Sequence, residues 1–364
     1  MKLFASLILI LNIITINQML SQNISFLNNY LGNVMIFDNG KIKQIEHLPL
    51  RSHKIGNIIM AYEDNAGNFK IYYNEFVNSI SNFVSEYFAS DTYVVFRLNT
   101  QVKVFDHGTV KTLSVYSPKF SLGNDLILWF DDIEKRLKAY YDNKIYELDD
   151  ALASGTYKEF TVVENIGAFH DNQGYFNVFF EGNIEKICFS DRLKSFSANR
   201  NILAYIEEPV NVFRVFYFGE IIDLENFEPQ SFKTGHDFVV YIDASNYLKI
   251  FYDFKTEIIS FDKPIFYEAV DDLVVFAVQN YFKVYHKGNV YTLENYIPEE
   301  YKCNNNVLVY KDQMGYLKFF DGNKIETITY EKVTDFDLHG SLPKFKYGVN
   351  SESIYFNSKL YNND

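Results

Sequence analysis

Carboxylates in tight turns are the residues of this chain whose types and positions could do chemistry. They stand in short segments rich in Asp, Asn and Gly that follow apolar runs. The members are Asp64, Asp131, Asp132, Asp171, Asp243 and Asp312. Clustered carboxylates can bind a partner or Ca²⁺, but the ordered D-x-[DN]-x-[DN]-G calcium loop does not occur. Asp and Asn also favour turns because their side chains bond to nearby backbone. We expect mainly structural turns, assign these six as candidate ligand- or partner-binding residues, and expect no cofactor, with Ca²⁺ the one alternative.

Catalytic motifs are missing from the sequence. The 7 His residues are scattered, and the chain has no H-E-x-x-H, G-x-S-x-G, P-loop or G-x-G-x-x-G pattern. A glycosidase, however, needs only two carboxyl groups at a suitable separation. We therefore expect a protein that is not an enzyme, and keep a carbohydrate-active hydrolase with a carboxylate pair as the alternative.

A recurring cation is the most regular polar feature. It stands in short strands of the form apolar-Lys-apolar-aromatic, at Lys70, Lys103, Lys138, Arg214, Lys249, Lys283 and Lys318, with Asn177 as the exception. Strand alternation places it on the face opposite its two apolar neighbours. We expect it to pair with a carboxylate on a neighbouring strand while its methylenes cover apolar surface. A continuous anion-binding stripe is the alternative.

The strands that carry these residues belong to an internal repeat. Successive copies start 33 to 39 residues apart, as from Phe69 to Val102 and from Leu137 to Phe176. Most are followed by a turn rich in Gly or Asn, such as His107-Gly108, which is typical of two-residue hairpins. A second strand follows that turn, and two more precede the motif. No helix is expected, because the one helical-looking stretch, 149–154, falls between repeats.

Tandem four-stranded antiparallel units of about 36 residues predict an all-β propeller, in which radial closure leaves few exposed strand edges. An open β-repeat stack is the alternative. The blade number is eight to ten, because the first unit looks short of its first two strands and the last is degenerate. Either the two termini complete one blade together, or the N-terminal hairpin is an accessory.

Over about residues 30–360 the chain resembles secreted bacterial β-propeller proteins in general. The resemblance implies fold and does not reach a named family. WD repeats would close each unit with Trp-Asp, whereas Trp129, the only Trp, precedes Phe130. The Asp-box of sialidase-like propellers and the double glycine of kelch repeats are both missing from the sequence.

The N-terminus and the composition indicate the compartment. Lys2, the apolar run 3–16 and the small residue Ser21 predict a signal peptide over 1–22, leaving a repeat domain over 23–364 without a membrane span. The net charge of −13 argues against nucleic acid as a partner. Cys188 and Cys303 are too few for a disulfide framework and are expected to be buried free thiols. The chain is expected to be secreted, periplasmic or held in the cell envelope.

These observations together predict a non-catalytic extracytoplasmic binding or scaffold protein. One propeller face, carrying the acidic turns, would bind a protein or a glycan. The widest repeat spacing, around 147–158, is the place where a specialised loop is expected.

Overall fold

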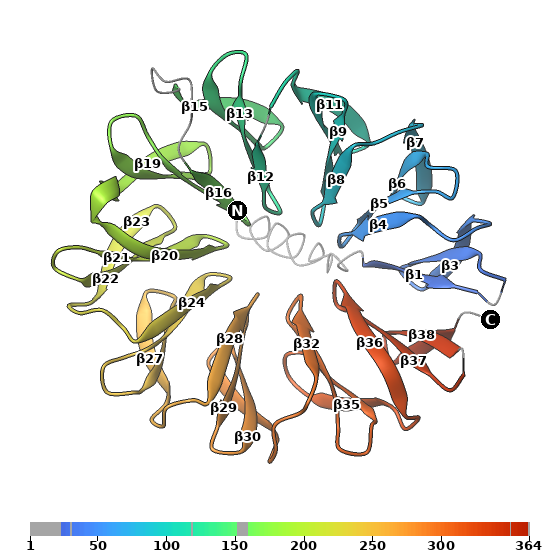
Figure 1. Ribbon diagram of the computed structural model, residues 1–364. Helices are drawn as coiled ribbons and strands as arrows, with labels where there is room; N and C mark the ends of the chain where they lie inside the picture. Colours follow the sequence, from blue (N-terminus) through green and yellow to red (C-terminus); the bar gives the residue numbers. More distant parts are fainter. Residues whose placement is uncertain (1–22, 30, 118, 151–158, 350, 363–364) are drawn as a thin grey trace, which may run out of the picture.

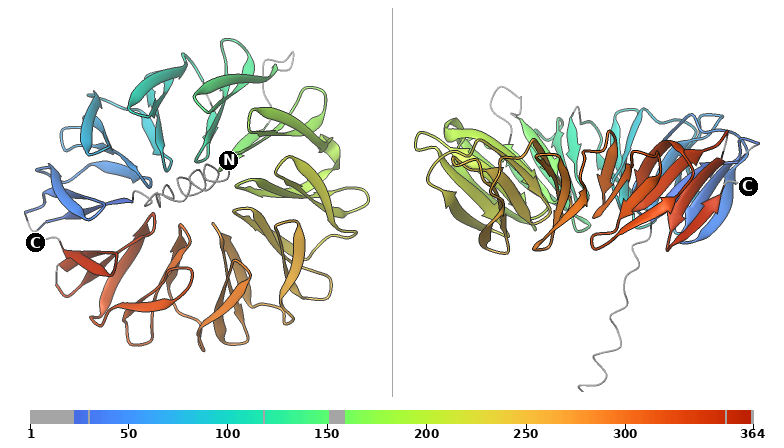
Figure 2. Two further views of the ribbon diagram at one scale, coloured as in Figure 1. Left: turned by 180° about the vertical axis from the view of Figure 1, so that it is seen from behind. Right: turned by 90° about the horizontal axis from the view of Figure 1, so that it is seen from below.

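In the computed structural model, residues 23–29, 31–117, 119–150, 159–349 and 351–362 are described. They form ten β-sheets arranged radially around a central axis (Figure 1). Seen from the side, the sheets make a shallow disc (Figure 2). The predicted propeller is confirmed with ten blades, and the open stack is wrong because the tenth sheet packs against the first. The predicted signal peptide and residues 151–158 of the widest repeat spacing lie outside the described residues.

The blades follow one another along the chain. Blades 1 to 5 are β1 (Ile24–Asn28), β2 (Val34–Asp38), β3 (Lys41–Glu46); β4 (Ser52–Ile55), β5 (Ile59–Glu63), β6 (Phe69–Tyr73), β7 (Phe76–Ser81); β8 (Glu86–Ala89), β9 (Tyr93–Leu98), β10 (Gln101–Asp106), β11 (Thr109–Ser114); β12 (Phe120–Leu122), β13 (Leu126–Asp131), β14 (Arg136–Tyr141), β15 (Lys144–Asp150); and β16 (Phe160–Val163), β17 (Ile166–His170), β18 (Tyr175–Phe180), β19 (Asn183–Phe189).

Blades 6 to 10 are β20 (Leu193–Asn199), β21 (Ile202–Glu207), β22 (Val212–Tyr217), β23 (Glu220–Glu225); β24 (Ser231–Gly235), β25 (Phe238–Ile242), β26 (Leu248–Tyr252), β27 (Lys255–Ser260); β28 (Phe266–Val270), β29 (Leu273–Val278), β30 (Tyr281–His286), β31 (Asn289–Glu294); β32 (Tyr301–Asn304), β33 (Val307–Lys311), β34 (Leu317–Phe320), β35 (Ile325–Thr329); and β36 (Val333–His339), β37 (Leu342–Tyr347), β38 (Ser351–Phe356), β39 (Lys359–Asn362). A single 3-10 turn, η1 (Ser190–Arg192), is the one helical element of the described chain, and no described helix is long and apolar enough to span a membrane.

Every blade is an antiparallel meander of consecutive strands, and in four-stranded blades the first strand lies nearest the axis (Figure 1). Blade 1 has three described strands, so the expectation that its unit lacks two strands was wrong. Blade 10 is a full four-stranded sheet despite its degenerate sequence. Neither alternative for the termini holds, because the N-terminal strands form a blade of their own and no described sheet mixes the two ends.

The core lies between blades. The second strands carry continuous apolar runs, as in β13, because both of their faces are covered by neighbouring sheets. Ten buried clusters result, one at each blade–blade interface. The cluster between blades 5 and 6 has ten buried residues, whereas the one between blades 10 and 1 has four: Leu27, Phe37, Leu342 and Ile354. The interface that closes the ring is thus the least apolar of those described.

The recurring cation pairs with a carboxylate at five of its seven positions, namely Lys70, Lys138, Arg214, Lys249 and Lys318. At the other two, Lys103 donates to Thr112 and Lys283 lies 5.8 Å from the Tyr281 ring centre. In two blades the cation belongs to a four-residue clamp, and a third blade has a closely similar arrangement. In blade 7, Lys249 Nζ lies 2.8 Å from Glu225 of blade 6 and 3.0 Å from Asp243, and the Tyr241 hydroxyl donates to Glu225 at 3.0 Å. A second clamp consists of Lys70, Glu46, Asp64 and Tyr62. In blade 9, Lys318 and Tyr310 both contact Glu294, and Asp312 lies beside them.

A β-bulge in the preceding blade, directly before that blade's own recurring cation, explains how the Glu reaches the clamp Lys of the next blade. In blade 6 the register of β22 and β23 shifts at Phe213, so that Glu225 pairs with Phe213 at the end of the ladder. A bulge adds a residue to one strand and re-aims its side chains. The bulge therefore turns the last Glu of one blade toward the Lys of the following blade.

Antiparallel order gives the disc two different faces. The turns between first and second strands and between third and fourth strands lie on one face, here called the channel-mouth face. The turns between second and third strands and the loops that link blades lie on the other, the loop face. The six acidic candidates are all on the loop face.

Candidate functional site

The acidic turn residues predicted as a binding set are held mainly by their own turns. Asp64, Asp131, Asp171 and Asp243 are buried, and Asp132 and Asp312 are half-buried. In Asp64, Asp171, Asp243 and Asp312 one carboxylate oxygen accepts backbone N–H groups two and four residues further on, at 2.8–3.0 Å. The set lies on one face of the disc, as predicted, but distributed among five blades.

Charges next to these carboxylates come from the inter-blade clamps. Burial opposes ionisation of Asp64, but hydrogen bonds from Asn68 and Lys70 outweigh it and lower the pKa of the carboxyl group. Hydrogen bonds from Lys249 and from the backbone of Tyr247 likewise lower the pKa of Asp243 against the effect of burial. Asp131 accepts from Ser114 at 3.0 Å, and Asp132 pairs with Lys135 at 2.7 Å. Within the described residues no group of three or more His, Cys, Asp or Glu side chains is placed to hold a metal ion.

A second set of polar residues surrounds the central channel. It consists of the tips of the turns between first and second strands, one from each of blades 2 to 10: Asn57, Asp91, Asn124, Glu164, Arg200, His236, Asp271, Asn305 and Gly340. Eight of these nine side chains are polar, and no two adjacent blades carry the same residue. We call this set the channel-mouth ring.

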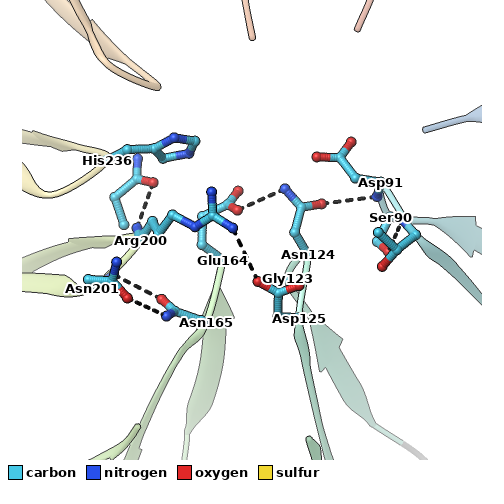
Figure 3. A network of polar contacts seen from close by, with 12 residues as sticks. Ser90, Asp91, Gly123, Asn124, Asp125, Glu164, Asn165, Arg200, Asn201 and His236 are labelled. Atoms are coloured by element: carbon cyan, nitrogen blue, oxygen red, sulfur yellow. Dashed lines mark hydrogen bonds and ion pairs between the residues drawn. The ribbon is translucent and has the colours of Figure 1, made fainter. Parts of the chain in front are cut away.

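Hydrogen bonds connect the ring from blade to blade (Figure 3). Asn124 lies between two carboxylate residues: its amide oxygen accepts from the backbone of Asp91 at 3.1 Å, and its amide nitrogen donates to Glu164 at 2.8 Å. Further round, Asn165 and Asn201 exchange two hydrogen bonds of 2.6 and 2.9 Å, and Asn201 also donates to Asp237. The tips are therefore fixed by their neighbours, so the mouth of the channel is preorganised.

The ring and the residues next to it are acidic overall. Carboxylates stand at Asp91, Asp125, Glu164, Asp237, Asp271 and Asp272, whereas the cations in the same turns are Arg200 and His236. Burial, together with the charges of Glu164 and Asp271, raises the pKa of Asp91 to about 6. Burial opposes protonation of His236, but Asp272 and Asp271 outweigh it and raise its pKa. The raised pKa of His236 favours its protonated form, which offsets part of the negative charge.

Glycine stands in the ring only where two distant tips meet. The Asn305 amide of blade 9 donates to Asn57 of blade 2 at 2.5 Å, across the turns of blades 10 and 1. A Cβ atom at Gly340 would lie 2.6 Å from Asn57 Oδ1 and 3.2 Å from Asn305 Nδ2, and φ at Gly340 is +60°. Both the contact and the backbone conformation therefore require glycine here.

The loop face carries exposed apolar side chains, most of them aromatic, in the links between blades. The exposed members are Leu48, Phe83, Tyr116, Phe189, Phe227, Phe261 and Tyr330. Phe261 and Tyr330 are 70% and 76% exposed, which is unusual for side chains of this size. We call these seven residues the aromatic set. Because each lies at the end of the outermost strand of its blade or one or two residues beyond it, they repeat around the loop face of the disc.

Three members of the aromatic set pack against a tyrosine that follows an acidic turn in the same blade, one of them stacked and two edge-to-face. The ring centroids are 4.6 Å apart for Tyr175–Phe189, 5.4 Å for Tyr247–Phe261 and 5.6 Å for Tyr316–Tyr330. In blade 5 the pair is flanked by Lys186, whose Nζ lies 4.2 Å from the Tyr175 ring centre. The acidic turns thus position aromatic pairs on the surface, even though their carboxylates are occupied locally.

Comparison with protein families agrees with this architecture. A model described as a 10-bladed beta propeller domain matches residues 18–361. The chain belongs to that family. No curated protein matches the sequence. The family match spans all ten blades, including the three-stranded first one.

Solved structures similar to this propeller share its fold alone. Prp20p from Saccharomyces cerevisiae is 10% identical over 58% of this chain and 75% of its own, with a TM-score of 0.32. The CRINKLY WD40 ectodomain of the Arabidopsis thaliana receptor kinase ACR4 is 10% identical over 74% and 93%, with a TM-score of 0.31. PorZ of Porphyromonas gingivalis is 11% identical over 91% and 56%, with a TM-score of 0.26.

The channel-mouth ring and the aromatic set were both missed in the sequence analysis. Short pairs of Gly, Asn or Asp, such as Gly56-Asn57 and Asn305-Asn306, recur before the second strand of most units, and their polarity at one position of the unit marks the ring. An aromatic residue one or two positions after the outermost strand also recurs. Aligning the repeats on the strands next to the linkers would have revealed it.

Proposed function

We propose that this ten-bladed propeller is a non-catalytic, extracytoplasmic binding or scaffold protein whose loop face binds another protein. The observation that carries the proposal is the aromatic set, because large exposed apolar surfaces on soluble proteins mark interaction sites. Aromatic side chains and Arg dominate the binding energy of protein interfaces. The half-exposed Asp132 and Asp312 lie on the same face and would add polar contacts at its rim.

Repetition favours a large partner over a small ligand. The aromatic residues come from separate blades, so one small molecule would contact few of them. The acidic turns that support them are equivalent in geometry from blade to blade, which suits a broad docking surface.

The test compares two triple variants of the chain in its native cell. Phe189→Ala, Phe261→Ala and Tyr330→Ala together remove three members of the aromatic set. Ile42→Ala, Ile145→Ala and Ile258→Ala together remove three exposed apolar residues of outermost strands as the matched control. Cross-linked partners are identified by mass spectrometry, and binding is repeated with purified components.

We expect the partner to be lost from the first variant and retained by the control. Equal capture by both variants would exclude the loop face as the docking surface. N-terminal sequencing of the mature protein tests the compartment: a chain beginning near residue 23 supports export, and a chain beginning at Met1 contradicts it.

Hydrolysis of a glycan is the second candidate, favoured by the channel-mouth ring. A carboxyl group with a pKa near 6 beside an ionised carboxylate is the arrangement that glycosidases use as general acid and nucleophile or base. Asp91 has the raised pKa, and Glu164 supplies a second carboxyl group on the other side of Asn124. Release of reducing ends from envelope glycans by the wild type, lost in Asp91→Asn, would support the enzyme. Equal release by the variant would exclude Asp91 as the acid.

A further inference from the structure

A cleft opens between blades 7 and 8 on the channel-mouth face, opposite the proposed docking surface. Two adjoining cavities form it, with volumes of about 150 and 340 Å³, and they share Ile250, Tyr252, Tyr285 and Lys287. Ligand pockets for small molecules have volumes of about 300–1,000 Å³. The cleft is therefore large enough for a ligand of one or two rings.

The floor of the cleft is apolar and aromatic. Phe238, Ile250 and Tyr285 line it from strands of both blades and are nearly inaccessible to solvent. Tyr252, at the end of β26, is 39% exposed and belongs to both cavities. An aromatic side chain with an uncovered face gives a flat apolar platform for a ring-shaped ligand.

The rim above this floor carries charges of both signs in near balance. Three cationic side chains line it, His236, Lys255 and Lys287. Four carboxylates accompany them, Asp237, Asp253, Glu257 and Asp272. An anionic ligand would meet four carboxylates and a cationic ligand three bases, so neither sign is favoured. Hydroxyl groups both donate and accept hydrogen bonds, and can use both kinds of partner in charge-assisted hydrogen bonds.

From the floor and the rim together, we propose that the cleft binds a neutral saccharide of one or two rings. One sugar ring lies on Tyr252, and its hydroxyl groups donate to the carboxylates and accept from Lys287. The proposal is independent of the loop-face function, because it uses the opposite face and none of the aromatic set.

Contacts between the two blades hold the polar groups in place before any ligand arrives. His236 Nε2 lies 3.2 Å from Asp271, and its backbone N–H donates to the Asp271 carbonyl at 2.6 Å. Lys287 Nζ lies 3.3 Å from Asp272, yet its side chain is 60% exposed, so it remains accessible. Preorganised groups lose less entropy on binding, which raises affinity.

The experiment titrates the full chain with maltose, cellobiose, lactose and N,N′-diacetylchitobiose by isothermal calorimetry. Binding of at least one disaccharide is expected, with a dissociation constant on the order of 1 mM or below. Tyr252→Ala and Lys287→Met should each weaken it about tenfold, since each removes a platform or a charge-assisted hydrogen bond. Two variants serve as controls. Tyr281→Ala removes a similarly exposed Tyr at the start of β30, away from the cleft, and Lys324→Met removes an exposed Lys of blade 9.

Each outcome decides for or against the cleft. Tenfold losses in the two cleft variants, with unchanged binding in the controls, support the proposal. No heat with any of the four sugars at about 10 mM overturns it. Binding that survives both Tyr252→Ala and Lys287→Met also overturns it. So does displacement of the sugar by inorganic phosphate at equal concentration, because an anion site would then be present.

Discussion

Replacing Asp91 by Asn should make the propeller more stable at neutral pH and not at acidic pH. Burial and the charges of Glu164 and Asp271 raise the pKa of Asp91 to about 6, from 3.8 in a solvated chain. A carboxyl group whose pKa is higher in the folded chain than in the unfolded chain favours the folded state when it is protonated. This contribution to stability is complete below about pH 4, where the group is protonated in both states. That contribution is lost as the pH rises through 6.

The magnitude follows from the two pKa values. A difference of about two corresponds to about 3 kcal/mol, at 1.36 kcal/mol for each pKa unit. Because Asp91 is partly exposed, solvent screening reduces this free energy. We expect Asp91→Asn to raise the free energy of unfolding by about 2 kcal/mol at pH 7.5. For a chain of 364 residues this is a rise in Tm of about 3 °C, using about 2.1 cal/mol/K of unfolding entropy for each residue.

The assay is thermal unfolding of wild type and Asp91→Asn by circular dichroism at pH 7.5 and pH 4. Asp142→Asn is the matched control, since Asp142 lies in a turn on the same face with its side chain 73% exposed. We expect a gain at pH 7.5 for Asp91→Asn alone. A gain of the same size at both pH values, or a loss at pH 7.5, would refute the argument that ionised Asp91 strains the channel-mouth ring.

Four further predictions follow from the clamps, the ring and the proposed sites. In chemical denaturation, Lys249→Met should lower the free energy of unfolding by about 2–3 kcal/mol, because it leaves Glu225 and Asp243 close together and largely buried. Lys41→Met, which removes an exposed ion pair, should leave the free energy of unfolding nearly unchanged in the same assay. Gly340→Ala should destabilise the protein more than Gly348→Ala in the same measurement: φ is +60° and +59°, but only Gly340 would clash with neighbours. Equal losses would show that backbone strain alone matters. The triple loop-face variant should lose its protein partner in cross-linking, and Tyr252→Ala should lose disaccharide binding in calorimetry.

The repeat unit could be predicted from the sequence because its determinants are local. An apolar-Lys-apolar-aromatic strand followed by a Gly- or Asn-rich turn specifies a hairpin wherever it occurs, and Leu317 to Phe320, followed by Asp321-Gly322-Asn323, is one example. The recurring cation was correctly predicted as an ion-pairing residue at most of its positions, since alternation already separates it from its apolar neighbours.

The blade count and the candidate site depended on information that is not local. Whether β1 and β36 belong to complete blades is decided by packing across the closing interface, where Leu27 and Phe37 contact Leu342 and Ile354. The carboxylates of Asp64 and Asp243 looked available because the sequence does not show that backbone N–H groups and lysines occupy them. Residues of the channel-mouth ring differ from blade to blade, so no single motif reveals them.

The interface between blades 10 and 1 has a dynamic consequence. Its strands share no ladder among the described residues, and it is held by a small apolar cluster and a few side-chain hydrogen bonds, such as Asn23 to Ser341 at 2.5 Å and Ser25 to His339 at 2.6 Å. In a repeat array each unit is stabilised mainly by its two neighbours. We therefore expect local unfolding to start at this junction and to spread into the neighbouring blades on both sides. In native-state hydrogen exchange, we expect the amides of β1 and β37 to be the first core positions to exchange, and those of blades 5 and 6 to be the last.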